Sequence, residues 1–226
     1  MTSRRRVSKQ KELSVLELAR ELGLTEGIVI IYGASGVGKT TFTLATMREY
    51  QGPKLYIASE PNVFYDGRIS IAKKIAEADY VKELPEAFRR ALIFLQKHEE
   101  SFVAVDSVSA FAQHEAAKRL MLEGEVPQPL SIVGPLSFAA NAMSQALAEH
   151  AIESKSIVWL IAQERPAIGR PWRGEDAAPS FAMRAIHSVY AVARLIYTGN
   201  KRILKVVMHR DPSKEGLVRE VPHISL

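Results

Sequence analysis

The fold is decided by the stretch Gly33-Ala34-Ser35-Gly36-Val37-Gly38-Lys39-Thr40. It fits the phosphate-loop pattern G-x-x-x-x-G-K-[ST]. An apolar run over 28–32 comes directly before it, and a helical pattern over 39–50 begins at its end. A phosphate loop requires this order of strand, loop and helix, because the glycines let backbone N–H groups turn toward phosphate oxygens and the helix N-terminus adds its dipole. The sequence therefore predicts a nucleotide site at this turn.

The chemistry of two loop side chains indicates their roles. The ammonium of Lys39 supplies charge to the β- and γ-phosphates of ATP, and the hydroxyl of Thr40 is expected to bind Mg²⁺. An apolar run over 102–105 ends in Asp106, which a parallel sheet places at its ligand-binding edge, so we expect this carboxylate in the magnesium shell as well. The predicted nucleotide-binding residues are Gly33, Ala34, Ser35, Gly36, Val37, Gly38, Lys39, Thr40 and Thr41.

Two further apolar runs are followed by polar residues. Glu60 comes just after the run 55–58, and its carboxylate is expected at the same edge, where it can orient or deprotonate water. The alternative is a carboxylate that caps the turn over 60–62. Gln163 ends the run 157–162, and its amide can sense the γ-phosphate and pass its state to the loop that follows. The alternative is a solvated glutamine at a strand end.

The composition excludes several classes of protein. The chain has 226 residues, of which 47% are hydrophobic and 24% charged, as in ordinary globular proteins. Its apolar runs are far shorter than a membrane span, and its charged first residues have no apolar segment behind them, so we expect no membrane helix, no secretory signal and a cytoplasmic location. Because there is no cysteine, disulfides, thiolate catalysis and cysteine-bound zinc are excluded.

The excess positive charge lies at the N-terminus. Residues 1–11 carry five of the 30 Lys and Arg residues and none of the 25 Asp and Glu residues, so the rest of the chain is neutral. We predict a flexible basic arm over 1–12 and a single domain over 13–226. The arm is either a solubilising tail or a segment that contacts phosphates.

The order of patterns predicts an α/β fold. Near-continuous apolar runs alternate with longer amphipathic stretches, as expected for a mostly parallel central sheet with helices on both faces. Two later runs, 189–197 and 202–209, are joined by a Gly-Asn turn, which predicts antiparallel strands at the C-terminal end. Two stretches rich in Gly and Pro, 123–134 and 164–180, are predicted to be long loops. Further helices are expected over 14–22, 69–78, 86–97, 107–120 and 136–151.

These residues together resemble the RecA/RadA/KaiC branch of phosphate-loop ATPases. Other branches place a catalytic acid directly beside the aspartate that ends the strand, whereas Ser107 follows Asp106 here. The segment 57–60, Ile-Ala-Ser-Glu, is similar to that branch's displaced catalytic glutamate, and Ala-Gln at 162–163 is similar to its strand-end glutamine. The resemblance covers about residues 25–224. It implies a RecA-like core that binds ATP and Mg²⁺.

The resemblance also implies a residue that acts between subunits. Residues 204–213 resemble the late strand from which RecA-like and KaiC-like proteins send a basic residue to a neighbour's nucleotide. Arg210 would take this role, with Lys205 and His209 as alternatives. A residue that acts at a neighbour's nucleotide implies that the protein forms a homo-oligomer. The N-terminal helical domain of RadA-type recombinases has no counterpart, so the chain most resembles a minimal archaeal RadA paralog that consists of the core ATPase domain.

The stretch after Gln163 has the composition of a single-stranded DNA contact. It carries arginines and a tryptophan, and such sites combine cations on phosphates with aromatic rings on bases. The alternative is a set of surface arginines paired to nearby acids. The predicted DNA-binding residues are Arg165, Arg170, Trp172, Arg173 and Arg184.

Three functions remain open from the sequence. The leading hypothesis is an ATPase that binds DNA, expected to be single-stranded, and assists recombination and repair with a RadA-type recombinase or other repair proteins. The second is a KaiC-like module whose ATP state controls a protein partner. The third is a metabolic kinase, for which the sequence offers no clear acceptor site.

Overall fold

The computed structural model describes residues 13–65, 67–124, 129–167, 171–180 and 188–226. The predicted arm, 1–12, lies outside these ranges, as do Arg170 and Arg184. The strands are β1 (Gly27–Gly33), β2 (Lys54–Ala58), β3 (Glu77–Tyr80), β4 (Phe102–Asp106), β5 (Ile157–Pro166), β6 (Ala177–Pro179), β7 (Ala191–Thr198), β8 (Lys201–His209) and β9 (Val218–Glu220). The helices are α1 (Val15–Glu21), α2 (Lys39–Glu49), α3 (Asn62–Tyr65), α4 (Arg68–Ile75), α5 (Leu84–Lys97), α6 (Ala110–Glu123) and α7 (Pro129–Glu153).

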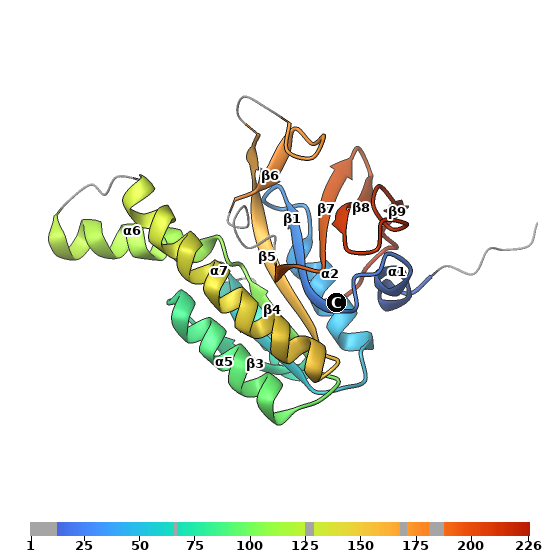
Figure 1. Cartoon of the computed structure of the whole chain (residues 1–226), viewed down its shortest axis with the longest axis horizontal. Helices are drawn as coiled ribbons and strands as arrows, with labels where there is room; N and C mark the ends of the chain where they lie inside the picture. Colours follow the sequence, from blue (N-terminus) through green and yellow to red (C-terminus); the bar gives the residue numbers. More distant parts are fainter. Residues whose placement is uncertain (1–12, 66, 125–128, 168–170, 181–187) are drawn as a thin grey trace, which may run out of the picture.

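The strands form one sheet with the order β3-β2-β4-β5-β1-β7-β8-β9, and β6 pairs with β5 at the side of this path (Figure 1). The strands from β3 to β7 run parallel, whereas β8 and β9 are antiparallel to their neighbours. Parallel neighbours need crossover connections, which explains the alternation of apolar runs with helical stretches. The predicted fold class is therefore confirmed.

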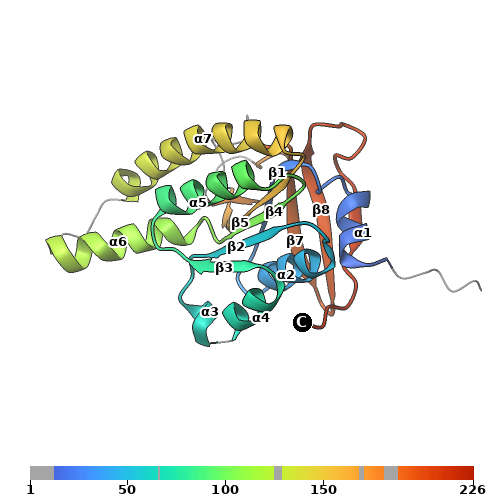
Figure 2. The same cartoon turned by 90° about the horizontal axis from the view of Figure 1, so that it is seen from below.

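Helices cover both faces of the sheet (Figure 2). Helices α1, α2 and α4 contribute to one apolar core, and α5, α6 and α7 contribute to the other. The central strands β1 and β4 are buried along their whole length. A strand that is covered on both faces favours apolar residues at successive positions, and this is why these runs do not alternate with polar residues.

Helix α1 shows how a local sequence signal fixes an element. The Ser14 hydroxyl accepts a hydrogen bond from the Glu17 backbone N–H at 3.2 Å, and the Glu17 carboxylate accepts one from the Ser14 backbone N–H at 2.9 Å. This reciprocal pair satisfies two donors that a helix start otherwise leaves unpaired. The predicted helix over 14–22 therefore begins at Val15, directly after its N-cap Ser14.

Three predicted elements differ from the structure. Residues 77–80 form the edge strand β3, although the sequence indicated that the helix over 69–78 continued there. Helix α7 begins at Pro129 and not at residue 136, and it extends away from the sheet together with α6 (Figure 1). The predicted loop over 164–180 contains the end of β5 and the short strand β6, which pair through Glu164 and Pro179.

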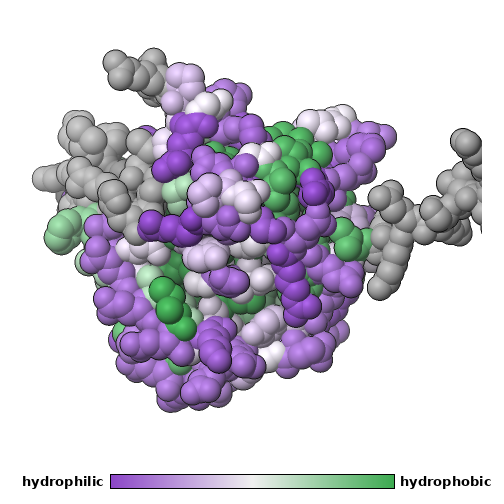
Figure 3. Space-filling model, turned by 45° about the vertical axis from the view of Figure 1, so that its right-hand side comes forward, coloured by the Kyte–Doolittle hydropathy of each residue, from purple (hydrophilic) through white to green (hydrophobic). Residues whose placement is uncertain are grey.

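The surface is that of an ordinary folded domain on the side shown in Figure 3, where hydrophobic areas lie between hydrophilic ones. Within the described ranges, no helix combines the length and the apolar character that a bilayer crossing requires.

Candidate active site

The phosphate-loop sequence forms the turn between β1 and α2. Gly33 ends β1, and a Cβ atom at this position would overlap the carbonyl oxygen of Leu195 on the neighbouring strand. Gly38 precedes α2 with a φ of 103°, in the left-handed region that favours glycine. The chain therefore has glycine at two positions where a side chain would either collide or strain the backbone, and this shapes the loop.

Lys39 is held beneath the loop by three acceptors. Its side-chain Nζ donates to the carbonyl oxygens of Gly33 at 2.9 Å and Ala34 at 2.8 Å, and to Oε1 of Gln163 at 3.0 Å. The residue is only 6% exposed. Burial lowers the pKa of Lys39, and the nearby carboxylates of Asp106 and Glu60 oppose this shift. The contact with Gln163 joins two predicted site residues that are far apart in the sequence.

Asp106 ends β4 as expected, and its carboxylate lies inside the protein. It is 4% exposed, and its Oδ2 accepts a hydrogen bond from the Tyr56 hydroxyl at 2.8 Å. Burial raises the pKa of Asp106, and hydrogen bonds from Thr40 and Tyr56 oppose that rise. The structure thus brings together Thr40 and Asp106, the two predicted magnesium ligands.

Glu60 lies between the two neighbouring strand ends. Its Oε1 accepts hydrogen bonds from the Ser107 hydroxyl at 2.7 Å and from Nε2 of Gln163 at 3.3 Å. Its Oε2 accepts one from the Asn62 side chain at 3.2 Å. The carboxylate therefore faces the strand ends that carry Asp106 and Gln163, and it contacts the turn over 60–62 only through Asn62.

Gln163 connects this cluster to the following segment. Its backbone N–H donates to the Ser109 hydroxyl at 2.9 Å, and its carbonyl accepts from the Ser180 N–H at 2.8 Å. The hydroxyls of Ser109 and Ser180 are 2.6 Å apart. Both ends of the segment over 164–180 are therefore tied to the residue that contacts Lys39.

Sequence reasoning missed Arg194, which lies on β7 beside the phosphate loop. Its guanidinium forms ion pairs with Glu164, Glu175 and Asp176, and its side chain is only 11% exposed. Although burial works against the charged form, hydrogen bonds to Asp176 and Glu175 raise the pKa of Arg194. A single arginine within the apolar run of β7 was the available signal, because buried charges require partners.

The predicted DNA-binding residues within the described ranges have different surroundings. Arg165 is exposed on the end of β5. Trp172 is half-buried and packs edge to face on Tyr32, with 5.9 Å between ring centroids. Arg173 lies 4.0 Å from a carboxylate oxygen of Glu215. The alternative of arginines paired with acids therefore applies to Arg173, whereas Arg165 has no ion pair with another described residue.

Arg210 lies at the opposite edge of the sheet from the phosphate loop. It follows the end of β8, whose last residue, His209, pairs with Ala191 at the start of β7. The Arg210 backbone N–H and side-chain Nε donate to the carbonyls of Tyr190 and Val189, at 3.0 and 3.1 Å. The structure does not bring Arg210 to the phosphate loop of its own chain.

The donor set at the carboxyl edge fits ATP with Mg²⁺. The loop backbone and the Lys39 ammonium offer donors for phosphate oxygens, and the Thr40 hydroxyl and Asp106 carboxylate are hard oxygen ligands of the kind that Mg²⁺ prefers. Mg²⁺ usually takes only one or two protein ligands and completes its shell with phosphates and water. The pair is therefore sufficient in number as well as in kind.

Comparisons of the sequence with protein-family models and with curated proteins found no match. Comparison with solved structures found the crystal structure of the RadB recombinase, which covers 90% of this chain and 91% of that chain with a TM-score of 0.60. This chain therefore shares the fold of that protein. The two sequences are 18% identical, so the likeness is one of fold. The antiparallel C-terminal strands that the sequence indicated are shown by the strand pairings of this structure.

Proposed function

We propose that this protein is an ATPase that binds single-stranded DNA and assists homologous recombination and repair, acting with a RadA-type recombinase. The domain that carries this activity is the RecA-like core over 13–226. The observation that supports it most is the hydrogen-bonded chain from Lys39 through Gln163 to Glu60, with donor–acceptor distances of 3.0 and 3.3 Å. These two hydrogen bonds link the phosphate loop, the candidate base and the segment that is rich in arginine.

Lys39 has no spare donor in this arrangement. An ammonium has three N–H groups, and three acceptors surround this one. A contact with a phosphate oxygen must therefore replace one acceptor. Two of them are backbone carbonyls of the loop, whereas the Gln163 amide is on a side chain that can rotate. We infer that nucleotide binding releases Gln163 from Lys39.

The release of Gln163 changes the environment of Glu60. The amide Nε2 of Gln163 donates to the same carboxylate oxygen that accepts from Ser107. Without the amide, this oxygen has a free lone pair for a water proton, as a general base requires. Mg²⁺ bound at Thr40 and Asp106 would supply the charge that neutralises the phosphates. Lys39 and the loop N–H groups orient the phosphates, and Glu60 accepts the proton.

The same release acts on the segment that follows. Glu164, the next residue, is bound by Arg194, and Arg194 also holds Glu175 and Asp176. A movement at Gln163 therefore reaches both ends of the segment that carries Arg165 and Trp172. In this way the nucleotide would set the affinity for DNA.

The test is the affinity for a labelled single-stranded oligonucleotide at low salt, with Mg²⁺ and either a non-hydrolysable ATP analogue or ADP. We expect the wild-type affinity to differ at least severalfold between the two nucleotides, and Gln163→Ala to remove that difference. Gln145→Ala, an exposed glutamine on α7, is the matched control and should behave as the wild type. If the wild-type protein binds DNA with the same affinity with either nucleotide, this coupling is excluded. The alternative function, a module whose ATP state controls a protein partner, would then be favoured.

A further inference from the structure

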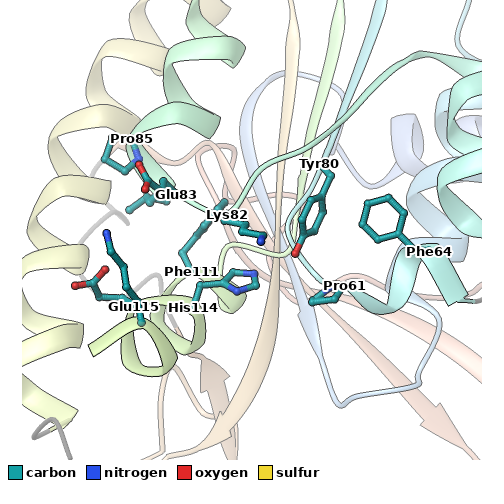
Figure 4. A pocket seen from close by; sticks show the side chains of 11 residues that line it. Pro61, Phe64, Tyr80, Lys82, Glu83, Pro85, Phe111, His114 and Glu115 are labelled. Carbon is teal, nitrogen blue, oxygen red and sulfur yellow. The ribbon is translucent and has the colours of Figure 1, made fainter. Parts of the chain in front are cut away.

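A second pocket lies beside the candidate active site, between the carboxyl ends of β2 and β3 and the helix α6 (Figure 4). Its volume is about 760 Å³, within the range of about 300–1,000 Å³ that is typical of ligand sites. The lining residues used below are Phe64, Tyr80, Lys82, Phe111, His114 and Lys118. All of them follow or end parallel strands, at the edge where open α/β sheets bind ligands.

Aromatic rings form the walls of this pocket. Phe64 is 53% exposed, and its ring lies edge to face on Tyr80 with 4.9 Å between centroids. Phe111, at the inner side, is buried. An exposed phenylalanine held at the rim of a pocket by a second ring presents a flat apolar surface to a ligand. Such surfaces suit a planar ring, because aromatic pairs gain energy beyond area burial.

The cations of the pocket are available to an anion. Lys82 and Lys118 are exposed, and within the described part of the chain neither ammonium has a hydrogen bond or an ion pair. Of the two acids in the lining, Glu115 is paired with Arg119 at 2.9 Å, so only Glu83 offsets the two lysines. The pocket therefore combines aromatic walls with unpaired positive charge.

His114 adds a polar group between the two halves of the pocket. Its Nε2 lies 2.5 Å from the carbonyl oxygen of Ser59, and since a carbonyl only accepts, Nε2 carries the proton. Figure 4 shows the imidazole, the Tyr80 hydroxyl and the Lys82 ammonium directed toward the same space. Ser59 immediately precedes Glu60, so His114 connects this pocket to the segment that carries the candidate base.

We propose that this pocket binds a nucleotide unit of single-stranded nucleic acid, with its base against Phe64 and Tyr80 and its phosphates at Lys82 and Lys118. Aromatic stacking combined with cations on the phosphates is how proteins hold single strands without sequence preference. An apolar peptide would leave both ammonium groups without an anion. The inference rests on the proposed function for its ligand, and it adds a contact away from the segment that carries Arg165 and Trp172.

The test measures the affinity for a fluorescein-labelled dT12 by anisotropy, over a series of salt concentrations with Mg-ADP present. Phe64→Ala should raise Kd about fivefold or more, since one stacked base contributes at least that factor. Lys82→Ala with Lys118→Ala should make the slope of log affinity against log salt shallower by about 1.4, because each lost phosphate contact on a single strand removes about 0.7. Lys73→Ala with Lys97→Ala removes the same charge from exposed positions elsewhere and should leave the slope unchanged.

Two further arms separate the alternatives. Competition of wild-type binding by dTMP, absent in Phe64→Ala, would show that a free mononucleotide suffices, and its failure would assign the site to a strand. Arg165→Ala with Trp172→Ala tests the DNA contact of the proposed function in the same assay. If this variant binds as the wild type while the pocket variants lose affinity, the proposed DNA segment fails and the pocket stands. If the pocket variants bind DNA with the wild-type affinity and salt dependence, the inference is overturned. This holds at any rate of ATP hydrolysis.

Discussion

Lys39 and Glu60 are two charged residues whose roles depend on what surrounds them. Lys39 is saturated with acceptors, so it can take a phosphate only by giving up the Gln163 amide. Glu60 accepts hydrogen bonds on both carboxylate oxygens, from Ser107, Gln163 and Asn62. At the scale of the residue, the site is a set of exchangeable hydrogen bonds around one buried cation.

Glu60→Gln should separate nucleotide binding from turnover. The amide has the shape of the carboxylate and can still accept from Ser107, so ATP affinity should stay within about twofold of the wild type. The rate of hydrolysis should fall by about 10²–10⁴, the usual contribution of a general base. Steady-state phosphate release and calorimetry of ATP binding measure the two quantities. Glu83→Gln, at an exposed carboxylate, is the matched control, and wild-type turnover in Glu60→Gln would move the role of base to another residue.

The segment from 171 to 180 is an element whose position depends on β7. Arg194 holds three carboxylates, two of which belong to that segment, and Lys205 on β8 forms a second ion pair with Glu175. Glu175 is buried, so its charge requires these partners. Charge pairs and the packing of Trp172 on Tyr32 therefore add to the pairing of β6 with β5 in holding the segment on the sheet.

Arg194→Gln should release this segment. It leaves the buried Glu175 carboxylate with Lys205 as its remaining ion-pair partner among the described residues, so the loss of folding free energy should approach the value of about 3–5 kcal/mol that breaking a buried pair costs. Urea unfolding measures that loss, and the fluorescence of Trp172 should shift toward that of an exposed indole before global unfolding. Arg219→Gln breaks an exposed pair with Glu21 and should cost no more than about 1 kcal/mol. Equal losses in the two variants would mean that Arg194 is no more than a surface partner.

The sequence predicted the elements whose signals are local. The phosphate loop, the strands β1, β2, β4 and β5 and the C-terminal hairpin follow from apolar runs and turn residues near each other in the chain. The strand β3 was missed because Glu77-Ala78-Asp79-Tyr80 is half polar, as an edge strand can be. The start of α7 was missed because Pro129, Gly134 and Pro135 indicate a loop, although Pro129 lies in the first turn of the helix, where proline is tolerated.

The candidate site also has residues that the sequence could place and contacts that it could not. Parallel strands bring their carboxyl ends to one edge, so Glu60, Asp106 and Gln163 could be placed there from the sequence alone. The contact of Lys39 with Gln163 and the ion pairs of Arg194 depend on the packing of distant strands. No local pattern encodes such partners, which is why the pocket between β3 and α6 was also not foreseen.

At the scale of the whole molecule, the candidate functional residues lie at two opposite edges of the sheet. The phosphate loop, Glu60, Asp106, Gln163 and the second pocket lie at the carboxyl edge of the parallel strands, whereas Arg210 lies at the opposite edge. If Arg210 contributes to ATP hydrolysis, it does so at the site of a second copy of the chain. We propose a homo-oligomer in which Arg210 of one protomer completes the nucleotide site of the next.

Mixing two inactive variants tests this arrangement. We expect Arg210→Ala and Lys39→Ala each to lose hydrolysis, because the first lacks the donated arginine and the second lacks the phosphate lysine. A mixture should regain part of the wild-type rate, since Lys39→Ala protomers can donate Arg210 to sites that retain Lys39. The rate of phosphate release is measured against the fraction of each variant. A mixture as inactive as its components, with oligomers present by light scattering, would remove Arg210 from the site.

The most direct test of the central claim is the rate of ATP hydrolysis with and without single-stranded DNA, at low salt and with Lys39→Ala as the blank. Coupling through Gln163 predicts that DNA raises the wild-type rate severalfold, that the rise disappears as salt increases because phosphate contacts weaken, and that Lys39→Ala shows no hydrolysis in either condition. A wild-type rate that is the same with and without DNA, under conditions in which the DNA is bound, would contradict the account.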